Sequence, residues 1–503
     1  MQLPKACTIP PREGGRERQM STSRNPMAPA SGVSRRALLQ GMAALGAAAG
    51  LGPMRAFAQD VTTIKWWDIF QPLIPLHQKI WDEFAASHPA KVEYTPGNPS
   101  DMMQSLQLAF RSNQLPDVFN VPNGNVATVN SLQAAGWFQP LADSFTFDKP
   151  FQKEALAEGF TSFGGKPYTF PIFAIRQNST SLWFFKAGLE AAGMDPEAGP
   201  ATWDDARKAA LAGTKDGKYG LILPLQFGDR MKAHFTDLAQ IAGAAGEIDW
   251  KTGNYAHASQ PFLDALEFLM SFQKDGSLHP GSSSVDARQG RARWVAGESL
   301  MFFDGPWNSG VLNGSFKDQI DLIGVTAQVP YPGDKATAFT YRPPNGGTFY
   351  ISSQSQHPDV ATQILQMLTT DDYYVGLAER MDQPPLDPGA VERANVHPAY
   401  KKVVTGYQDY VRIAPDPLAR NTAVSAVYSE MRDVTPGLGE IIQGAFSGAF
   451  SDPKPILQQY ADQMSKERDR AIEVAKSKGA EVSLDDWVFD AWKPGEDFTA
   501  DKY

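Results

Sequence analysis

"GESLMFFDGPWNSGV", residues 297–311, joins a short apolar run to a chain break and a large aromatic residue. The run Leu300–Phe303 predicts a buried strand. Asp304–Pro306 then break the chain, and the proline fixes one backbone angle at the break. Trp307 follows at once. The pattern therefore predicts a tryptophan held on a stiff corner at the end of a buried strand.

Strand and helix patterns alternate well before this corner. Strand patterns at residues 61–70, 90–97 and 115–125 are separated by helix patterns at 73–89 and 101–114. This alternation predicts a mostly parallel sheet with helices on its faces, so the fold class is α/β.

A second group of elements surrounds the corner itself. The extended, polar middle of residues 165–193 predicts a crossover into a second lobe, and Thr202 with Asp205 predicts the capped start of a helix. The last 24 residues are acidic and are expected to fold back on the surface. Further strands and helices are predicted at residues 219–230, 261–276, 283–298, 348–355, 357–380 and 453–479.

Composition and charge limit the classes of partner. The chain has 503 residues with a formal charge of −10, and 42% of them are hydrophobic. Residues 1–58 hold eight Lys/Arg and two Asp/Glu, so the remainder carries −16. An acidic body argues against a nucleic acid partner and against an anionic membrane surface. The single cysteine, Cys7, excludes disulfides and thiolate metal sites.

The first 58 residues are typical of an export signal. Arg35 and Arg36 precede a weakly apolar run, and Ala56–Ala58 gives the small-x-small pattern of a cleavage site. The Ser-Arg-Arg-x-Leu-Leu order resembles a twin-arginine signal. A membrane anchor fits less well, because a span needs about 20 apolar residues and this run is interrupted by glycine. With no cysteine at the cleavage point, we expect a soluble periplasmic product without a lipid anchor, whether translation starts at Met1 or Met27.

Motifs of catalysis are missing from the sequence. No nucleophile elbow, phosphate-binding loop, dinucleotide fingerprint or zinc-protease motif occurs, and the seven histidines are isolated. We therefore expect no cofactor, no metal site and no enzymatic activity. Carboxylates are plentiful, so a glycosidase pair stays open as an alternative.

The corner and several other segments together resemble extracellular solute-binding protein family 1, whose best-known member binds maltose and maltodextrin for a bacterial ABC importer. The shared order comprises "LPDVF", "GKPYTFP", "PATWDDARKAA", "GESLMFFDGPW", "QPPLDPGAV" and "APDPLARN", and it extends from Val61 to Lys478. The resemblance implies the two-lobed type II fold of periplasmic binding proteins, with a ligand cleft between two α/β lobes joined by crossovers.

The resemblance also implies a division of the chain. We expect a cleaved leader at 1–58, a first lobe at 59–175 and 336–390, a second lobe at 176–335, second-lobe or hinge helices at 391–478, and a C-terminal extension at 479–503.

In the family, the tryptophan of the Gly-Pro-Trp corner stacks on the sugar, so the resemblance gives that role to Trp307. Strand ends and the crossover supply polar candidates, because ligands sit at the carboxyl ends of strands in open α/β sheets. Amides suit hydroxyls because they both donate and accept. The expected ligand-binding residues are Trp307, Trp67, Asp68, Asn120, Asn123, Asn125, Arg176, Gln177, Gln226, Asp229 and Arg420.

Departures from the maltodextrin binder favour a different saccharide or a polyol. Val121 and Pro122 replace an aromatic residue that stacks on the sugar there. The alternatives are a same-fold binder of a glycerol phosphodiester, a polyamine or a metal chelate, and a secreted polysaccharide-processing enzyme. A phosphate would need arginines, to which Arg176 and Arg342 could contribute, whereas Arg288, Arg291 and Arg293 are expected on a solvated helix face.

The resemblance implies two partners, a small carbohydrate and the permease subunits of an ABC transporter. The export signal at residues 1–58 implies two more during export, the twin-arginine translocase and signal peptidase. A monomer without nucleic acid is expected.

Overall fold

The structure is a computed structural model that describes residues 61–122, 126–344, 346–387 and 389–503. The predicted leader at 1–58 and the predicted ligand residues Asn123 and Asn125 lie outside these ranges.

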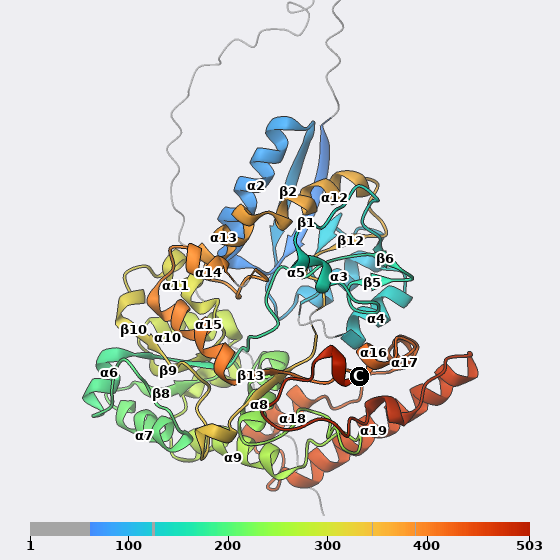
Figure 1. The fold of residues 1–503 in the computed structure, drawn as a ribbon. Helices are drawn as coiled ribbons and strands as arrows, with labels where there is room; N and C mark the ends of the chain where they lie inside the picture. Colours follow the sequence, from blue (N-terminus) through green and yellow to red (C-terminus); the bar gives the residue numbers. More distant parts are fainter. Residues whose placement is uncertain (1–60, 123–125, 345, 388) are drawn as a thin grey trace, which may run out of the picture. The chain divides into compact units, whose positions relative to one another are not determined.

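The first lobe is built on a five-stranded sheet with the order β2-β1-β3-β12-β4 (Figure 1). Strand β1 runs parallel to β2 and β3, whereas β12 runs antiparallel to β3 and β4. The predicted mostly parallel sheet is therefore confirmed. The strands are β1 Thr62–Asp68, β2 Ala90–Pro96, β3 Val118–Phe119, β4 Phe138–Gln139 and β12 Tyr350–Ser352.

Helices cover both faces of this sheet, and the alternation of side chains along β1 decides what each face meets. Trp66 is fully buried on one face, with its ring 5.5 Å from that of Trp81 and 4.8 Å from that of Phe349. Trp67 points to the other face and packs against a separate apolar cluster. The first face packs on α2 Ile74–Ser87, α12 Pro358–Gln366 and α13 Asp371–Glu379, and the second on α3 Met102–Arg111 and α4 Val126–Ala134.

The second lobe is built on a four-stranded sheet with the order β10-β7-β9-β8. Strand β9 contains the apolar run of the opening stretch and is buried along its whole length, as predicted. It runs parallel to β8 and antiparallel to β7. The strands are β7 Ser181–Phe185, β8 Tyr219–Ile222, β9 Ser299–Asp304 and β10 Ile323–Val325.

The helices of the second lobe pack into one large apolar cluster with this sheet. The predicted capping box is confirmed, because the Thr202 side chain accepts from the Asp205 backbone N–H and the Asp205 side chain accepts from the Thr202 N–H. These helices are α6 Lys186–Ala191, α7 Trp203–Gly213, α8 Gly228–Ile241, α9 Gln260–Lys274, α10 Ala287–Val295, α11 Asn308–Ser315 and α18 Leu438–Ser447.

The chain crosses between the lobes three times. It leaves the first sheet after β4 and joins the second at β7, returns at β12, and goes back along α15 Pro398–Tyr410, whose side chains pack in the apolar clusters of both lobes. Beside these crossings, β11 Thr340–Arg342 pairs with β13 Val411–Ile413.

The remaining elements are short or near the C-terminus. Helix α17 packs against α4 of the first lobe as well as against α19. The remaining elements are α5 Pro150–Glu154, β5 Ser162–Phe163, β6 Lys166–Pro167, α14 Ala390–Arg393, α16 Pro417–Arg420, α17 Val424–Glu430 and α19 Lys454–Ser477. Single turns of 3-10 helix occur at Gln71–Leu73, Pro280–Ser284, Ile320–Leu322, Lys335–Thr337, Met367–Thr369, Leu484–Trp487 and Ala500–Lys502.

The C-terminal segment, residues 479–503, is part of the core rather than a surface layer. Trp487 and Phe489 are fully buried, and Trp492 is nearly so. Phe489, Trp492 and Phe498 form an apolar cluster with Trp250 and Tyr341. The prediction that this acidic segment folds back was right, but its tryptophans are buried rather than on the surface. Trp492 packs beside Tyr341 of β11, and Trp487 packs in a separate apolar cluster with α16, α17 and α19.

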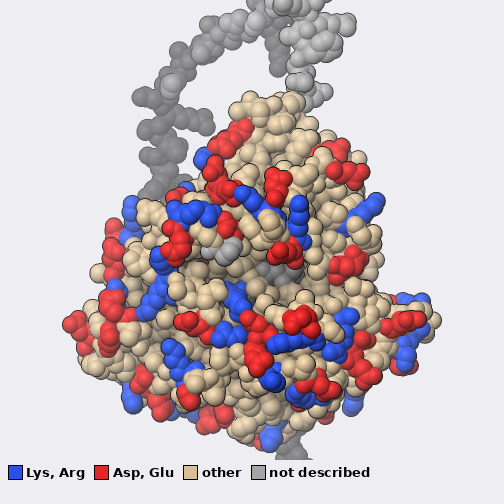
Figure 2. All heavy atoms as spheres, in the orientation of Figure 1, with Lys and Arg blue, Asp and Glu red and all other residues tan. Residues whose placement is uncertain are grey.

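Acidic and basic side chains are interspersed over the face shown in Figure 2. Among the described residues of that face, no extended basic surface of the kind that nucleic acid needs is visible. Within the described ranges, no helix combines the length and the apolar character that crossing a membrane requires.

Candidate functional site

The corner after β9 is fixed by one buried carboxylate. Asp304 Oδ1 accepts from the Gly305 backbone N–H at 2.9 Å and from the Trp307 indole N–H at 2.6 Å. Asp304 Oδ2 accepts from Nε and Nη2 of Arg291 at 2.8 and 2.5 Å. Asp304, the last residue of β9, thus orients Trp307, the tryptophan predicted at this corner. Arg291 of α10 in turn holds Asp304 in place.

Gly305 lies against the face of the Trp307 indole. A Cβ at Gly305 would overlap three carbons of the six-membered ring, so the ring can occupy this position only because residue 305 has no side chain. The Arg230 guanidinium lies over the same ring system, 4.7 Å from its centroid. Trp307 is consequently half-buried and its orientation is set from three directions.

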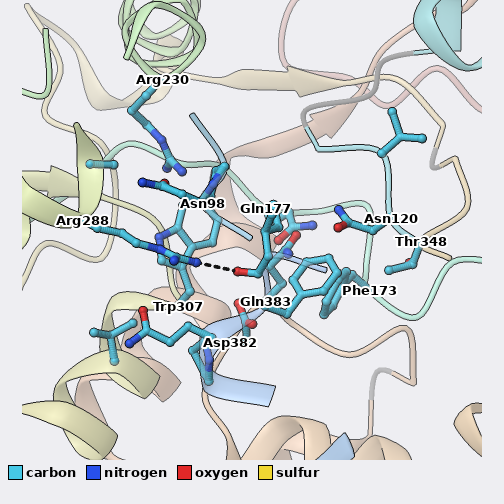
Figure 3. Close-up of a pocket in the computed structure, with 18 of the residues that line it drawn as sticks. Asn98, Asn120, Phe173, Gln177, Arg230, Arg288, Trp307, Thr348, Asp382 and Gln383 are labelled. Carbon is cyan, nitrogen blue, oxygen red and sulfur yellow. Dashed lines mark hydrogen bonds between the residues drawn. The ribbon is translucent and has the colours of Figure 1, made fainter. Parts of the chain in front are cut away.

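Trp307 borders a cavity of about 360 Å³, a size suited to a small ligand (Figure 3). Residues directly after β1, β2 and β3 line it from the first lobe, as expected where parallel strands end. Helices α8 and α10 and the corner line it from the second lobe, and the first crossover contributes Gln177. The lining residues are Ile69–Pro72, Asn98, Pro99, Asn120, Val121, Pro171, Phe173, Gln177, Arg230, Ala287, Arg288, Arg291, Trp307, Val311, Gly346–Thr348, Asp382 and Gln383.

Four buried polar atoms at this cavity lack a hydrogen-bond partner among the described residues. Three are acceptors: Asn120 Oδ1, Gln177 Oε1 and Asp382 Oδ2. The fourth, Arg230 Nη1, is a donor and lies 3.6 Å from Asp304 Oδ1, beyond hydrogen-bonding distance. Buried polar groups in folded proteins are nearly always paired, so these four atoms require polar partners, which a ligand or ordered water in the cavity can supply.

Two arginines reach into the cavity from the second lobe. Arg288 Nη2 donates to the Ile69 carbonyl at 3.2 Å and so connects α10 to the chain after β1, the dashed line in Figure 3. Burial lowers the pKa of Arg230, which Asp304 opposes, and burial also lowers the pKa of Arg288. Desolvation disfavours the charged guanidinium in both cases.

Asp382 is the only carboxylate among the lining residues. Burial, followed by the charge of Asp68, raises the pKa of Asp382 to about 7. Asp68 itself is buried behind the cavity, where it accepts from the Trp66 indole N–H at 2.8 Å, the Phe70 backbone N–H at 3.0 Å and the Tyr94 hydroxyl at 2.9 Å. Its oxygens are therefore used within the fold.

Of the residues predicted to bind the ligand, the structure brings Trp307, Asn120 and Gln177 together at the cavity. Trp67 and Asp68 do not line it, because the alternation along β1 directs Trp67 into an apolar cluster and Asp68 into internal hydrogen bonds. Asn123 and Asn125 lie outside the described residues.

The other predicted site residues lie elsewhere. Gln226 and Asp229 are exposed at the start of α8 and do not line the cavity. Arg176 pairs with Asp497 at 2.6 Å, and Arg420 lies 3.8 Å from the Phe489 ring. Both arginines hold the C-terminal segment, which the sequence did not indicate.

Of the remaining arginines, only Arg293 lies where it was expected, 42% exposed on its helix. Arg288 and Arg291 were expected on a solvated helix face, but Arg288 lines the cavity and Arg291 is buried against Asp304. Their spacing of three placed them on one face of α10, without indicating which way that face points. Arg342, a candidate for phosphate, is paired with Asp237 at 2.5 Å. Nothing in the sequence singled out Arg230 or Asp382.

A family described as bacterial extracellular solute-binding protein matches residues 73–375, more than half of the chain. The chain belongs to this family. It is therefore a solute-binding protein, as the resemblance of its motifs implied, and the fold is the two-lobed one of that family. No curated protein sequence matches it.

Solved structures of other solute-binding proteins share the fold. An ABC transporter protein of Thermotoga lettingae bound to α-D-tagatose is 17% identical, with a TM-score of 0.61 over 81% of this chain and 100% of that chain. The acarbose-binding GacH receptor of Streptomyces glaucescens is 18% identical, with a TM-score of 0.60 over 81% and 99%. A protein of Agrobacterium radiobacter K84 bound to ribitol is 14% identical, with a TM-score of 0.60 over 81% and 99%.

Proposed function

We propose that this solute-binding protein serves an ABC importer and that its solute is a carbohydrate. The observation that carries the proposal is the set of three unpartnered buried acceptors, on Asn120, Gln177 and Asp382, beside an oriented indole. Hydroxyl groups donate to such acceptors, and the C–H groups of a sugar or polyol pack on an aromatic face. The tagatose, acarbose and ribitol of the structural relatives support the same class of ligand.

Polyamines fit this cavity less well. Its lining has three arginines and one carboxylate whose pKa burial raises to about 7. A polycation would lose its water beside like charges, which is unfavourable.

We infer that the protein binds without catalysing a reaction. The ligand would contact residues after β1 and β3 in the first lobe and α8, α10 and Trp307 in the second. A ligand that touches both lobes favours the closed arrangement by its extra affinity for it. Closure would then be the state that the permease subunits recognise, with the protein acting as a monomer and without a cofactor.

A thermal-shift screen tests this function. We expect sugars or polyols, and not polyamines, to raise the melting temperature progressively with concentration, because ligands that bind only the folded state stabilise it by mass action. The same mixtures should show no product by chromatography after prolonged incubation. Turnover of a bound oligosaccharide would favour the enzyme instead, and a broad saccharide panel without any shift would refute the carbohydrate proposal.

We further propose export to the periplasm by the twin-arginine route, with cleavage after Ala58 by signal peptidase and without lipid attachment. Arg35 and Arg36, the Ala56–Ala58 pattern and the absence of cysteine beyond Cys7 support this. Replacing both arginines by lysine should leave the precursor in the cytoplasm, as seen by cell fractionation. Undiminished export of that variant would argue for the general secretion route.

A further inference from the structure

Two arginines at the cavity are not hydrogen-bonded to any carboxylate of the described residues. Arg291, the third arginine of the lining, is satisfied by its two bonds to Asp304. Apart from its contacts with aromatic rings, Arg230 has a 3.6 Å ion pair with Asp304 and no hydrogen bond to a described carboxylate. Among the described residues, Arg288 donates only to the Ile69 carbonyl. The cavity therefore offers spare guanidinium donors.

The burial of Arg230 makes its spare donor significant. Its side chain is 11% exposed, and its Nη1 is buried without a hydrogen bond. A buried charged group without full pairing is costly, so it is seldom kept without a partner. The guanidinium is held over Trp307 by a cation–π contact, and Figure 3 shows it directed toward the cavity.

Two carboxylates near these arginines, Asp286 and Asp304, are already used by the protein. Asp286, which lies close to Arg288 and opposes the lowering of its pKa by burial, caps α10 through the Gln289 N–H at 2.8 Å and accepts from Asn98 Nδ2 at 2.7 Å. Asp304 accepts four hydrogen bonds at the corner. Neither carboxylate lines the cavity, so neither occupies the space in front of Arg230 and Arg288.

We propose that the carbohydrate carries an oxyanion, a carboxylate or a phosphate, which Arg230 and Arg288 bind while its hydroxyls meet Asn120 and Gln177. This rests on the proposed function and narrows it to acidic saccharides. Guanidinium groups suit both anions, because their planar N–H groups match pairs of oxygens. In Figure 3 the two arginines and Trp307 lie on one side of the cavity and the two amides on the other, so one ligand can contact both sets.

Paired probes test the charge directly. Isothermal titration of the full-length protein would compare D-glucuronate, D-galacturonate and glucose 6-phosphate, together with uronate oligosaccharides, against their neutral counterparts. We expect an acidic member to bind at least about 10-fold more tightly than its neutral match, and less tightly as sodium chloride rises from 20 to 500 mM, because salt screens the attraction. Uronates and sugar phosphates are each compared with their own neutral counterparts, so the titrations show whether the bound anion is a carboxylate or a phosphate.

The outcomes separate this inference from the proposed function. If neutral saccharides bound as tightly as the acidic ones, or more tightly, the proposal of an acidic ligand would be refuted. The proposal of carbohydrate binding would remain. Glycerol 3-phosphate or a glycerol phosphodiester binding where no saccharide of either kind binds would overturn both.

Arg288→Gln is the variant of choice, because Arg288 is only partly buried and makes a single hydrogen bond. It should weaken an acidic ligand by about 10- to 100-fold, the range for a lost charge-assisted hydrogen bond, and a neutral ligand much less. Arg288→Lys should retain part of the difference. The control is Arg293→Gln, on the same helix but outside the cavity and 42% exposed.

Melting temperatures without ligand would verify that each variant folds. Equal losses for acidic and neutral ligands in Arg288→Gln, or an Arg293→Gln effect of the same size, would contradict the assignment.

Discussion

At the scale of single residues, Gly305 controls the position of the aromatic ring at the cavity. Gly305→Ala places a methyl group where the Trp307 ring now lies, so the ring must move. We expect ligand affinity to fall at least about 10-fold, in the same direction as Trp307→Ala, for which the loss of an aromatic anchor predicts roughly 2 kcal/mol. Calorimetry with the best ligand of the saccharide panel measures both.

The matched control is Gly314→Ala in α11, where an added Cβ meets nothing within 4 Å. This variant should keep the wild-type affinity and melting temperature. If Gly305→Ala bound as well as Gly314→Ala, the orientation of Trp307 would not matter for binding.

Asp382 predicts a dependence of stability on pH. Its folded pKa of about 7 exceeds the value of about 4 of an ordinary carboxyl group. Between these values the folded protein binds more protons than the unfolded chain. The stabilising contribution is therefore complete below about pH 4 and is lost as the pH rises through about 7. Burial is the main cause of the raised pKa, to which the charges of Asp68 and Asp304 add, while the Gln383 N–H and Arg291 lower it.

Asp382→Asn keeps the side chain neutral at every pH. We expect its melting temperature to fall less than that of the wild type between pH 5 and 8, measured by calorimetry. Some slope should remain, because burial also raises the pKa of Asp416 to about 7. The control is Asp318→Asn, at an exposed site, whose melting temperature should fall with pH as much as that of the wild type. If the melting temperature of Asp382→Asn fell by the same amount, Asp382 would not be the group that titrates.

The sequence predicted part of the candidate site. Trp307, Asn120 and Gln177 could be found because strand ends and crossovers carry ligand contacts in open α/β sheets. Arg230 and Arg288 could not, since a helical repeat shows which residues share a face but not what that face meets. Asp382 follows no strand pattern, and only the three-dimensional arrangement places it near Asp68.

At the scale of elements, alternation and capping signals gave reliable predictions. Four strands of the first sheet (β1, β2, β3 and β12), the capping box at Thr202 and the long helix α19 were recognisable, whereas β4 was not predicted. The pairs β5–β6 and β11–β13 were not predicted, because strands of two or three residues carry too little periodicity. The C-terminal segment was underestimated for another reason: its acidic composition concealed aromatic residues that pack inward.

Phe489 predicts how much this segment contributes to stability. Its ring is fully buried and lies 5.6, 5.3 and 6.0 Å from those of Trp250, Phe498 and Tyr503. Phe489→Ala should cost about 3–5 kcal/mol, typical of a phenylalanine removed from a core, and chemical denaturation measures this. Leu484→Ala, 37% exposed in the same segment, is the control and should change stability much less. Similar small losses in both would show that the segment is a surface layer.

At the scale of the whole molecule, the cavity depends on both lobes. Residues after β1, β2 and β3 come from one sheet, while Arg230, Arg288 and Trp307 come from elements around the other. Neither lobe alone holds the amides and the arginines together. The fold thus makes binding and the relative arrangement of the lobes two aspects of one equilibrium.

The C-terminal segment also contacts the connections between the lobes. Asp497 binds Arg176 of the first crossover and the Ile413 N–H of β13, and the Gly495 N–H donates to the Tyr341 hydroxyl of β11. These hydrogen bonds hold the first crossover, β11 and β13 together. We therefore expect the hinge motion between the lobes to be confined to the few connecting residues that the C-terminal segment does not contact. We expect a smaller opening angle than in relatives without it, which hydrogen exchange or small-angle scattering of Asp497→Ala would reveal as greater mobility or expansion. A binding protein whose lobes move less between the open and closed states spends less of the ligand's binding free energy on that movement, so we expect more of it to remain as affinity.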